Sequence, residues 1–380
     1  MASFPRKMLD CAEPVWASPN LSKAGKPPAG KSKSRGLVRQ GGCLREPRPI
    51  MRIVLCYPVE PRHIADIAAA APAADVVDAG QQRVADELPD ADIFCGHPKV
   101  PVPWDRVVGQ GRLNWIQSSA AGLDHCLVPV VVGSGIVVTS ASGVLADQVS
   151  EHAVGLAIAC TRRLPLFLAQ QTAREFVRRP TRDLTGATVG IVGLGGVGRR
   201  LATVLAPFRV RILATDWFPV HKPPEVEFLG PPSSLPDLLR QVDVLFLCAP
   251  LTAQTRGMIN AEALALMRPG GILVNVARGP LVDAAALTAA LESGQLDSAA
   301  VDVTPEEPPA ADSPLWRAPR LIITPHVAGQ SSRRIDAMTD FFCDNLRRYV
   351  QKKPLWNLVD KRLGFPEPSQ RSVAGEPETG

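Results

Sequence analysis

The sequence predicts an α/β fold made of two Rossmann-like domains. Short continuous apolar runs alternate along the chain with helical stretches, which is typical of parallel strands buried on both faces. One of these runs, residues 188–192, leads directly into a glycine-rich turn, residues 193–198, and then into a helix. We therefore expect a doubly wound parallel sheet inserted into a smaller flavodoxin-like domain.

The composition agrees with such a fold. The 380 residues leave room for two domains, and 46% hydrophobic with 21% charged residues fits a soluble globular protein. The chain has no run of about 18 apolar residues, so we expect no membrane span and no membrane partner. The eight cysteines form no C-x-x-C pair, which predicts neither a metal site nor disulfides and favours a cytoplasmic location.

Both ends of the chain differ from the middle. Residues 1–50 contain ten Lys and Arg and three Asp and Glu, a net charge of +7. The charge of this basic extension exceeds the net charge of +5 of the whole chain, so the remaining residues are slightly acidic. Its Pro-, Gly- and Ser-rich composition predicts disorder, and its scattered charges without interleaved aromatic residues predict no nucleic-acid binding. Met51 is the expected start of the functional polypeptide, and residues 365–380 are expected to form a disordered tail.

Residues 51–148 are expected to form the first part of the smaller domain. A helical stretch, 63–71, follows the first of four expected strands, which are residues 53–56, 92–95, 115–118 and 137–139. The third strand ends in a turn of small residues that would let another group approach the backbone closely. This turn reads Ser119-Ala120-Ala121-Gly122-Leu123-Asp124.

Residues 149–326 are expected to form a dinucleotide-binding domain, entered through a helix over about 145–163. In its glycine-rich turn, Gly193 allows the tight bend, Gly195 lets the backbone approach a pyrophosphate, and Gly198 permits close helix–strand packing. Gly196 and Val197 complete the turn, and the helix N-terminus offers N–H groups to the phosphates.

A second strand of this domain, residues 210–215, ends on Asp216. This aspartate lies 18 residues after Gly198, near the spacing expected for an acid that binds the 2′-hydroxyl of a ribose. We therefore expect NAD as the cofactor, because the carboxylate would repel the extra phosphate of NADP. His221 and Lys222 lie close enough in sequence to leave NADP open.

Three later apolar runs each lead to one reactive side chain. They end near Arg278, near the pair Glu306 and Glu307, and at His326. Ligands of parallel sheets bind beyond the carboxyl ends of the strands, so we expect these groups to meet there.

A cation, a carboxylate and an imidazole together suit the reduction of a carbonyl group. Hydride addition leaves negative charge on oxygen, which needs a proton donor and a nearby cation. Imidazole suits the donor role, and the planar guanidinium of Arg suits a substrate carboxylate. Plainer interpretations remain open: Arg278 capping a strand, the glutamates in a solvated turn, and His326 as a structural residue.

Over roughly residues 51–364 the chain resembles the D-isomer-specific 2-hydroxyacid dehydrogenases. Five segments carry the resemblance in the order of that family: Thr188 to Gly195, Pro250-Leu251-Thr252 with Thr255, Val274 to Gly279, Asp302-Val303 with Glu307-Pro308, and Thr324-Pro325-His326. The resemblance implies that Arg278 binds the substrate, His326 is the acid/base, and Glu307 is its paired carboxylate.

The resemblance also implies further contacts. Pro250, Thr255 and Ala277 would line the cofactor groove, and Asp302 would bind the nicotinamide carboxamide unless it only forms a turn. The backbone of Ala120, Ala121 and Gly122 would bind the substrate carboxylate, with an ordinary strand-to-helix turn as the alternative. Residues 327–364, with a helix over 332–351, would complete the substrate domain, and the protein would be a homodimer.

The expected function is NAD-dependent hydride transfer to a small 2-keto acid such as glyoxylate or hydroxypyruvate, or its reverse. Phosphoglycerate is less expected, because relatives that use it place an Arg where this chain has Gly96-His97-Pro98-Lys99. The alternative is an NAD-sensing protein similar to the corepressor branch of the same fold, in which catalysis is vestigial.

Overall fold

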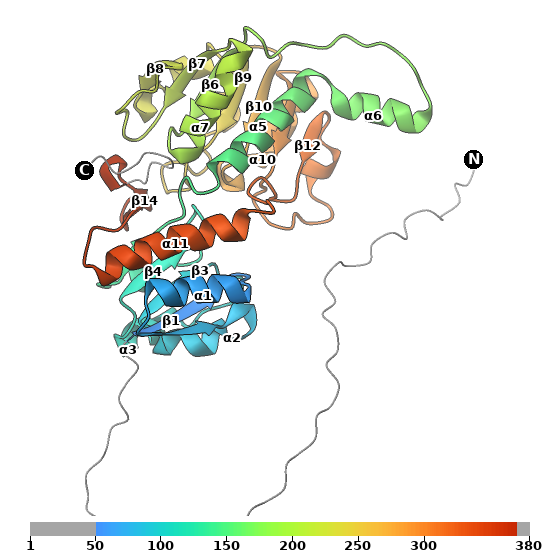
Figure 1. The fold of residues 1–380 in the computed structure, drawn as a ribbon. Helices are drawn as coiled ribbons and strands as arrows, with labels where there is room; N and C mark the ends of the chain where they lie inside the picture. Colours follow the sequence, from blue (N-terminus) through green and yellow to red (C-terminus); the bar gives the residue numbers. More distant parts are fainter. Residues whose placement is uncertain (1–50, 371–380) are drawn as a thin grey trace, which may run out of the picture. The chain divides into compact units, whose positions relative to one another are not determined.

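The computed structural model describes residues 51–370, which form two parallel sheets flanked by helices (Figure 1). The expected basic extension, residues 1–50, and residues 371–380 lie outside the described residues. The α/β class and the two Rossmann-like domains are confirmed.

The first sheet has five parallel strands in the order β2-β1-β3-β4-β5, the flavodoxin-like order. The strands are β1 (Met51–Cys56), β2 (Ala74–Asp78), β3 (Ile93–Gly96), β4 (Trp115–Ser118) and β5 (Val137–Thr139). The flanking helices are α1 (Pro61–Ala70), α2 (Gly80–Glu87), α3 (Trp104–Gln110) and α4 (Pro129–Val132). The sequence did not reveal β2, because this partly exposed edge strand lacks a continuous buried run.

The second sheet has seven parallel strands in the order β12-β11-β10-β9-β6-β7-β8. They are β6 (Thr188–Val192), β7 (Arg211–Thr215), β8 (Val226–Gly230), β9 (Val244–Leu247), β10 (Gly271–Asn275), β11 (Leu296–Val301) and β12 (Leu321–Ile323). Its helices are α5 (Ala146–Thr161), α6 (Leu164–Ala173), α7 (Gly196–Leu205), α8 (Leu235–Leu239), α9 (Ala261–Leu266) and α10 (Ala284–Ser293). The strand order reverses next to β6, and ligands of such sheets bind at this switch point.

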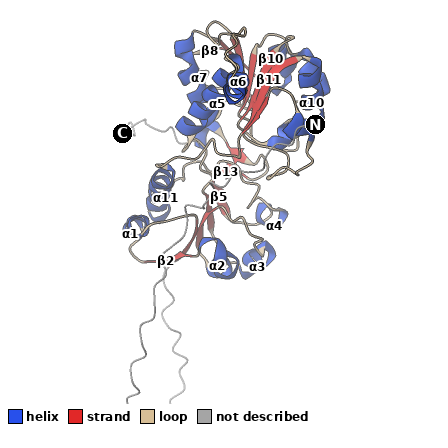
Figure 2. Cartoon of the chain, turned by 90° about the vertical axis from the view of Figure 1, so that its right-hand side faces the viewer, coloured by secondary structure: helices blue, strands red, loops and turns tan. Residues whose placement is uncertain are grey.

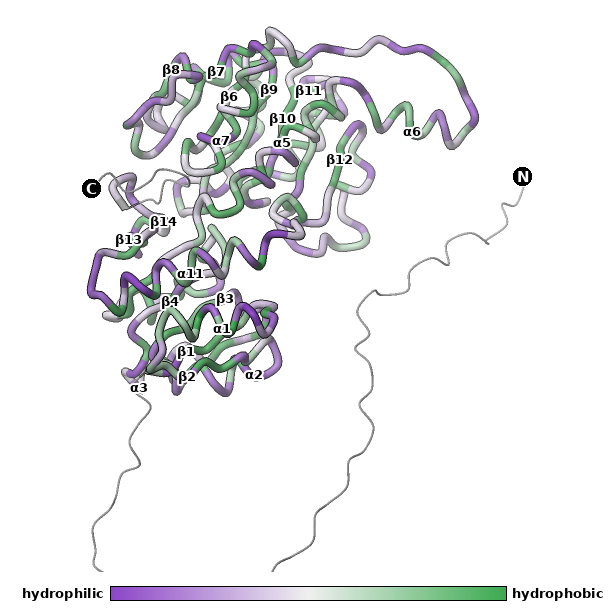
Figure 3. The backbone as a smooth tube through the Cα atoms, viewed as in Figure 1, coloured by the Kyte–Doolittle hydropathy of each residue, from purple (hydrophilic) through white to green (hydrophobic). Residues whose placement is uncertain are grey.

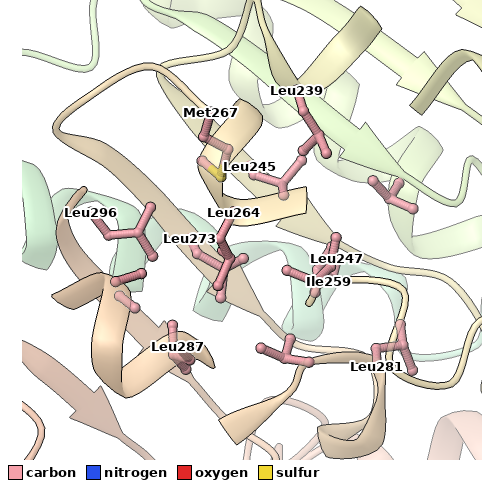
Figure 4. Packing of buried hydrophobic residues seen from close by; sticks show 14 of the residues in the cluster. Leu239, Leu245, Leu247, Ile259, Leu264, Met267, Leu273, Leu281, Leu287 and Leu296 are labelled. Atoms are coloured by element: carbon pink, nitrogen blue, oxygen red, sulfur yellow. The ribbon is translucent and has the colours of Figure 1, made fainter. Parts of the chain in front are cut away.

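Each face of the second sheet has its own apolar core. On one face, leucines of β9 and β10 such as Leu245, Leu247 and Leu273 pack against Leu239 and Leu264 of the covering helices (Figure 4). On the other face, Phe246 packs with residues of α5 and α7. The central strands are accordingly hydrophobic along their length (Figure 3). Burial on both faces explains why these strands were recognisable as continuous apolar runs.

The chain returns to the first sheet through α11 (Arg334–Val350), which lies beside α1 (Figure 2). Phe342 and Leu346 of α11 belong to the same core as Ile53 and Trp115. Farther on, β13 (Val359–Asp360) pairs with β14 (Phe365–Pro366), so the disorder that we expected from residue 365 is wrong for this strand. Within residues 51–370, the structure contains no helix with the length and apolar character needed to span a membrane.

Asn345 of α11 joins three segments of the first domain and is fully buried. Its Nδ2 donates to Gln117 Oε1 and to Trp356 O, each at 3.0 Å, and its Oδ1 accepts from Trp356 N at 2.8 Å. Gln117 lies on β4, so this amide ties the returning helix to the sheet.

We predict that Asn345→Ala lowers the free energy of unfolding by about 2–4 kcal/mol, because it leaves several buried polar groups without partners. The midpoint of urea unfolding, followed by circular dichroism, measures the effect. Asp344→Ala, which removes an exposed neighbouring side chain, is the matched control. Equal midpoints for the two variants would contradict the prediction.

Candidate active site

The carboxyl ends of β11 and β12 bring Glu307 and His326 together. The two strands are parallel neighbours, and His326 Nδ1 lies 2.7 Å from Glu307 Oε2. The pair is partly exposed, with 48% of the His326 side chain and 39% of the Glu307 side chain accessible. Because Glu307 engages Nδ1, the Nε2 atom is the ring nitrogen left to face a reacting group.

The turn after β11 fixes the side chain of Glu307 but not that of Glu306. Thr304 N donates to Glu307 Oε1 at 3.3 Å, and Thr304 Oγ1 donates to Glu306 O at 2.5 Å. Glu306 is exposed and uses its backbone rather than its side chain in this turn. Of the two glutamates that the sequence offered, the structure places Glu307 beside the imidazole.

The backbone at His326 has a positive φ of 53°, so the loop needs support from elsewhere. Asp302 provides it: its backbone oxygen accepts from His326 N at 2.8 Å. Its carboxylate, 1% exposed, accepts from Val327 N at 2.9 Å and from Ala328 N at 2.8 Å. The expected nicotinamide ligand therefore also holds the loop that carries His326.

Two more side chains complete this support: Thr324, which belongs to the Thr324-Pro325-His326 motif, and His152, which no motif indicated. Thr324 Oγ1 donates to Asp302 Oδ1 at 2.6 Å, and His152 Nε2 lies 3.0 Å from Thr324 Oγ1. His152 Nε2 is also 3.5 Å from Asp302 Oδ1. His152 comes from α5, so a helix and two strands together anchor the loop.

Arg278 lies against the small-residue turn of the first domain. Its Nη1 donates to Ala277 O at 2.8 Å, and its Nε donates to Asp124 Oδ2 at 3.2 Å. A Cβ added to Gly122 would lie 1.5 Å from Arg278 Nη2, so only glycine allows this approach. The ion pair with Asp124, the last residue of the small-residue turn, was not expected from the sequence.

The three residues expected to bind a substrate carboxylate differ in their N–H groups. Ala120 N already donates to Ser118 Oγ at 3.0 Å. The N–H groups of Ala121 and Gly122 make no hydrogen bond within residues 51–370. The turn therefore offers two N–H groups next to the guanidinium of Arg278.

A stacked pair of imidazoles lies next to Arg278. The rings of His97 and His125 have centroids 3.9 Å apart and planes 18° apart. Burial, helped by the positive charges of Arg278 and Lys99, lowers the pKa of His97 to about 4. Burial together with His97 and Arg278 lowers the pKa of His125 to about 3. Each histidine follows a strand end, but nothing in the sequence showed that the rings meet.

The glycine-rich turn has the shape of a cradle for a dinucleotide. Gly193 has φ 94°, and a Cβ there would lie 2.6 Å from Ala249 N. A Cβ on Gly198 would lie 2.1 Å from Gly193 O, whereas a Cβ on Gly195 would meet nothing within 4 Å. The turn is therefore closely packed at Gly193 and Gly198 and open at Gly195. The open space suits a pyrophosphate at the N-terminus of α7.

Gly196 and Val197 form the first turn of α7, which begins at Gly196, three residues before the helix start that we expected. A Cβ on Gly196 would lie 2.5 Å from Gly143 Cα. Val197 contributes its carbonyl, which accepts from Ser150 Oγ at 3.4 Å. The turn therefore packs closely against both Gly143 and α5.

The other expected cofactor contacts lie at strand ends of the same sheet. Asp216, 9% exposed, follows β7 and accepts from Leu194 N at 2.7 Å and from Phe218 N at 2.9 Å. Thr255 Oγ1 donates to Pro250 O at 2.8 Å in the turn after β9. Asp216 thus fixes the glycine-rich turn and keeps carboxylate lone pairs for a ribose hydroxyl.

The stacked histidines predict a pH effect on stability. Both have a lower pKa in the folded chain than the ordinary value of about 6.5, so the unfolded chain binds more protons as the pH falls below 6.5. Stability should therefore fall between about pH 6.5 and pH 4. In the double variant His97→Phe/His125→Phe, the urea midpoint should fall less between pH 7 and pH 5 than in the native chain.

The control for this measurement is His221→Asn, which removes an exposed imidazole and keeps a residue type that tolerates the positive φ at this position. It should retain the native pH dependence. A double variant with an unchanged pH dependence would contradict the prediction.

Comparison with known proteins identifies the family. Residues 154–328 match the model of the D-isomer specific 2-hydroxyacid dehydrogenase, NAD binding domain. The chain is 32% identical over 283 residues to a glycerate dehydrogenase of Methylorubrum extorquens, covering 72% of this chain and 87% of that protein. It is 35% identical over 264 residues to a glyoxylate reductase of Thermofilum pendens, covering 66% of this chain and 76% of that protein.

Solved structures agree. A D-isomer specific 2-hydroxyacid dehydrogenase from Xanthobacter autotrophicus, in complex with NADPH and MES, superposes with a TM-score of 0.72 at 27% identity, covering 83% of this chain and 99% of that one. The chain therefore belongs to the D-isomer-specific 2-hydroxyacid dehydrogenases, a family of NAD(P)-dependent oxidoreductases.

Proposed function

We propose that the protein transfers a hydride between NAD(H) and a small 2-keto or D-2-hydroxy acid, in the size range of glyoxylate and hydroxypyruvate. The contact of 2.7 Å between His326 and Glu307 is the observation that carries this proposal. Arg278 follows β10, the parallel neighbour of β11. The similarity to a glycerate dehydrogenase and a glyoxylate reductase supports short acids as substrates.

In the proposed reaction, bound NADH supplies the hydride and the side chains supply the rest. Arg278 binds the substrate carboxylate and the carbonyl oxygen, aided by the N–H groups of Ala121 and Gly122. His326 donates a proton from Nε2 to the carbonyl oxygen as negative charge develops there. Glu307 orients the ring through its contact with Nδ1.

The cofactor would lie along the glycine-rich turn. Gly193, Gly195 and Gly198 shape the cradle, and Asp216 would accept hydrogen bonds from the ribose. We propose NAD over NADP, because the nearly buried Asp216 carboxylate places negative charge where NADP carries its extra phosphate. Lys222 Nζ donates to Val226 O at 2.5 Å, so this cation is already engaged by backbone.

We predict that His326→Ala and Glu307→Gln each lower kcat by about 10²–10⁴-fold, because they remove the acid or the group that orients it. Loss of NADH absorbance with glyoxylate, hydroxypyruvate and pyruvate measures turnover. Glu306→Gln is the matched control and should retain native kcat. Tight NADH binding without turnover of any 2-keto acid by the native chain would favour the alternative function, an NAD sensor.

We further propose that the protein is a homodimer in the cytoplasm. Helix α6 and the segment after it extend away from the second sheet (Figure 1) and carry exposed apolar side chains, among them Leu168 at 62% and Phe176 at 100% accessibility. A second copy of the chain would cover them. Buried free cysteines such as Cys95 and Cys160 suit a reducing compartment.

We predict that the native chain elutes as a dimer in size-exclusion chromatography with light scattering, and that Leu168→Glu/Phe176→Glu shifts it to the monomer. The charged side chains would be costly to bury in an apolar interface. Val350→Glu, at an exposed apolar residue of α11, is the control and should stay dimeric. A native monomer would contradict the proposal.

A further inference from the structure

The stacked pair of His97 and His125 is built from two neighbouring strand ends. His97 directly follows β3, and His125 lies in the turn after β4. The strands are adjacent and parallel, with Gly96 opposite Ser118. Their carboxyl ends therefore hold the two rings side by side, at a centroid distance of 3.9 Å.

The pair borders the residue that we propose as the substrate anchor. His125 follows Asp124, whose Oδ2 lies 3.2 Å from Arg278 Nε. The positive charge of Arg278 acts on both imidazoles, and that of Arg334, the first residue of α11, acts on His97. The imidazoles and these two arginines therefore share one small region.

The side chain of Gln81 holds the backbone on both sides of Pro98 in place. Gln81 of α2 donates from Nε2 to His97 O at 3.0 Å, and its Oε1 accepts from Lys99 N at 2.7 Å. A recognition group works best when its position is fixed before the ligand arrives, because little ordering is then needed on binding.

Polar atoms in this region have unused hydrogen-bonding capacity. Both ring nitrogens of His125 and Nε of Arg334 are buried, and none of the three has a hydrogen-bond partner in good geometry within residues 51–370. The backbone group that acts on the His125 ring is that of Gly96. Buried polar groups in native proteins are normally paired, so each such atom calls for an explanation. Three of them next to one arginine point to a ligand group that both donates and accepts hydrogen bonds.

The electrostatics narrow the choice of that group. With pKa values of about 4 and about 3, both imidazoles are neutral near pH 7, and a neutral imidazole has one N–H donor and one nitrogen acceptor. A hydroxyl also donates and accepts, so it matches a neutral imidazole in both directions. A methyl group in the same place would leave the polar atoms unpaired.

We propose that the stacked pair of His97 and His125 determines substrate specificity by binding a hydroxyl group on C3 of the 2-keto acid. This inference rests on the proposed function. With the carboxylate and carbonyl bound by Arg278 and the carbonyl oxygen facing His326, C3 is the remaining part of the substrate. The stacked pair lies next to Arg278, so we assign the binding of C3 to this pair.

The test compares three acids that differ only at this position: hydroxypyruvate has a C3 hydroxyl, pyruvate has a C3 methyl, and glyoxylate has no C3. We expect the native chain to favour hydroxypyruvate over pyruvate in kcat/KM by about tenfold or more, because a site built for a hydroxyl rejects the analogue that lacks it. The ratio should be the same from pH 6 to pH 8, since both imidazoles stay neutral in this range.

The variants His97→Phe and His125→Phe keep a flat ring in the stack and remove its nitrogens. Each should reduce the ratio of hydroxypyruvate to pyruvate to about one, through a loss confined mainly to hydroxypyruvate. Glu306→Gln should keep the native ratio. Because the native ratio is itself a readout, the test does not depend on both variants folding.

Two results would overturn the inference. One is a native chain that reduces glyoxylate but uses pyruvate as well as hydroxypyruvate. The other is a pair of variants that lose the same factor with all three acids, as expected for a structural role. Failure of the native chain to reduce even glyoxylate would instead overturn the proposed function, and this inference with it.

Discussion

The carboxylate of Asp302 is the group on which the geometry of the active site depends. It is buried at the end of β11, and it accepts hydrogen bonds from Thr324, Val327 and Ala328. These bonds surround His326, whose backbone has a positive φ and would not hold this position unaided. A buried carboxylate makes strong hydrogen bonds, so the loop that carries His326 is held in place before any substrate binds.

The sequence predicted the parts of the molecule whose physics is local. Burial on both faces of the second sheet produces apolar runs. At positions 193 and 198 a Cβ would clash with nearby backbone atoms, so glycine is required there. Arg278, Glu307 and His326 were selected because each lies at or shortly after the end of such a run. The fold class therefore followed from pattern and spacing, whereas the family and the proposed roles of these three residues came from the resemblance of five motifs.

Contacts between segments that are distant in sequence could not be predicted in the same way. Asp124 and Arg278 are 154 positions apart, and no local pattern indicates their ion pair. The stacking of His97 on His125 depends on the register of β3 against β4. The strand β2 was missed for a related reason: its half-exposed edge position leaves no continuous apolar run. Tertiary packing decides each of these features.

The accessibility of the His326–Glu307 pair has a consequence for proton supply. Nearly half of the imidazole is in contact with solvent, although the loop beneath it is anchored on a buried carboxylate. In the proposed reaction, bulk water would therefore return a proton to the ring directly after each turnover. An acid buried inside the protein would need a chain of relay groups for the same purpose. Here the buried carboxylate of Asp302 holds the loop, and the exposed side of the ring contacts the solvent that would supply the proton.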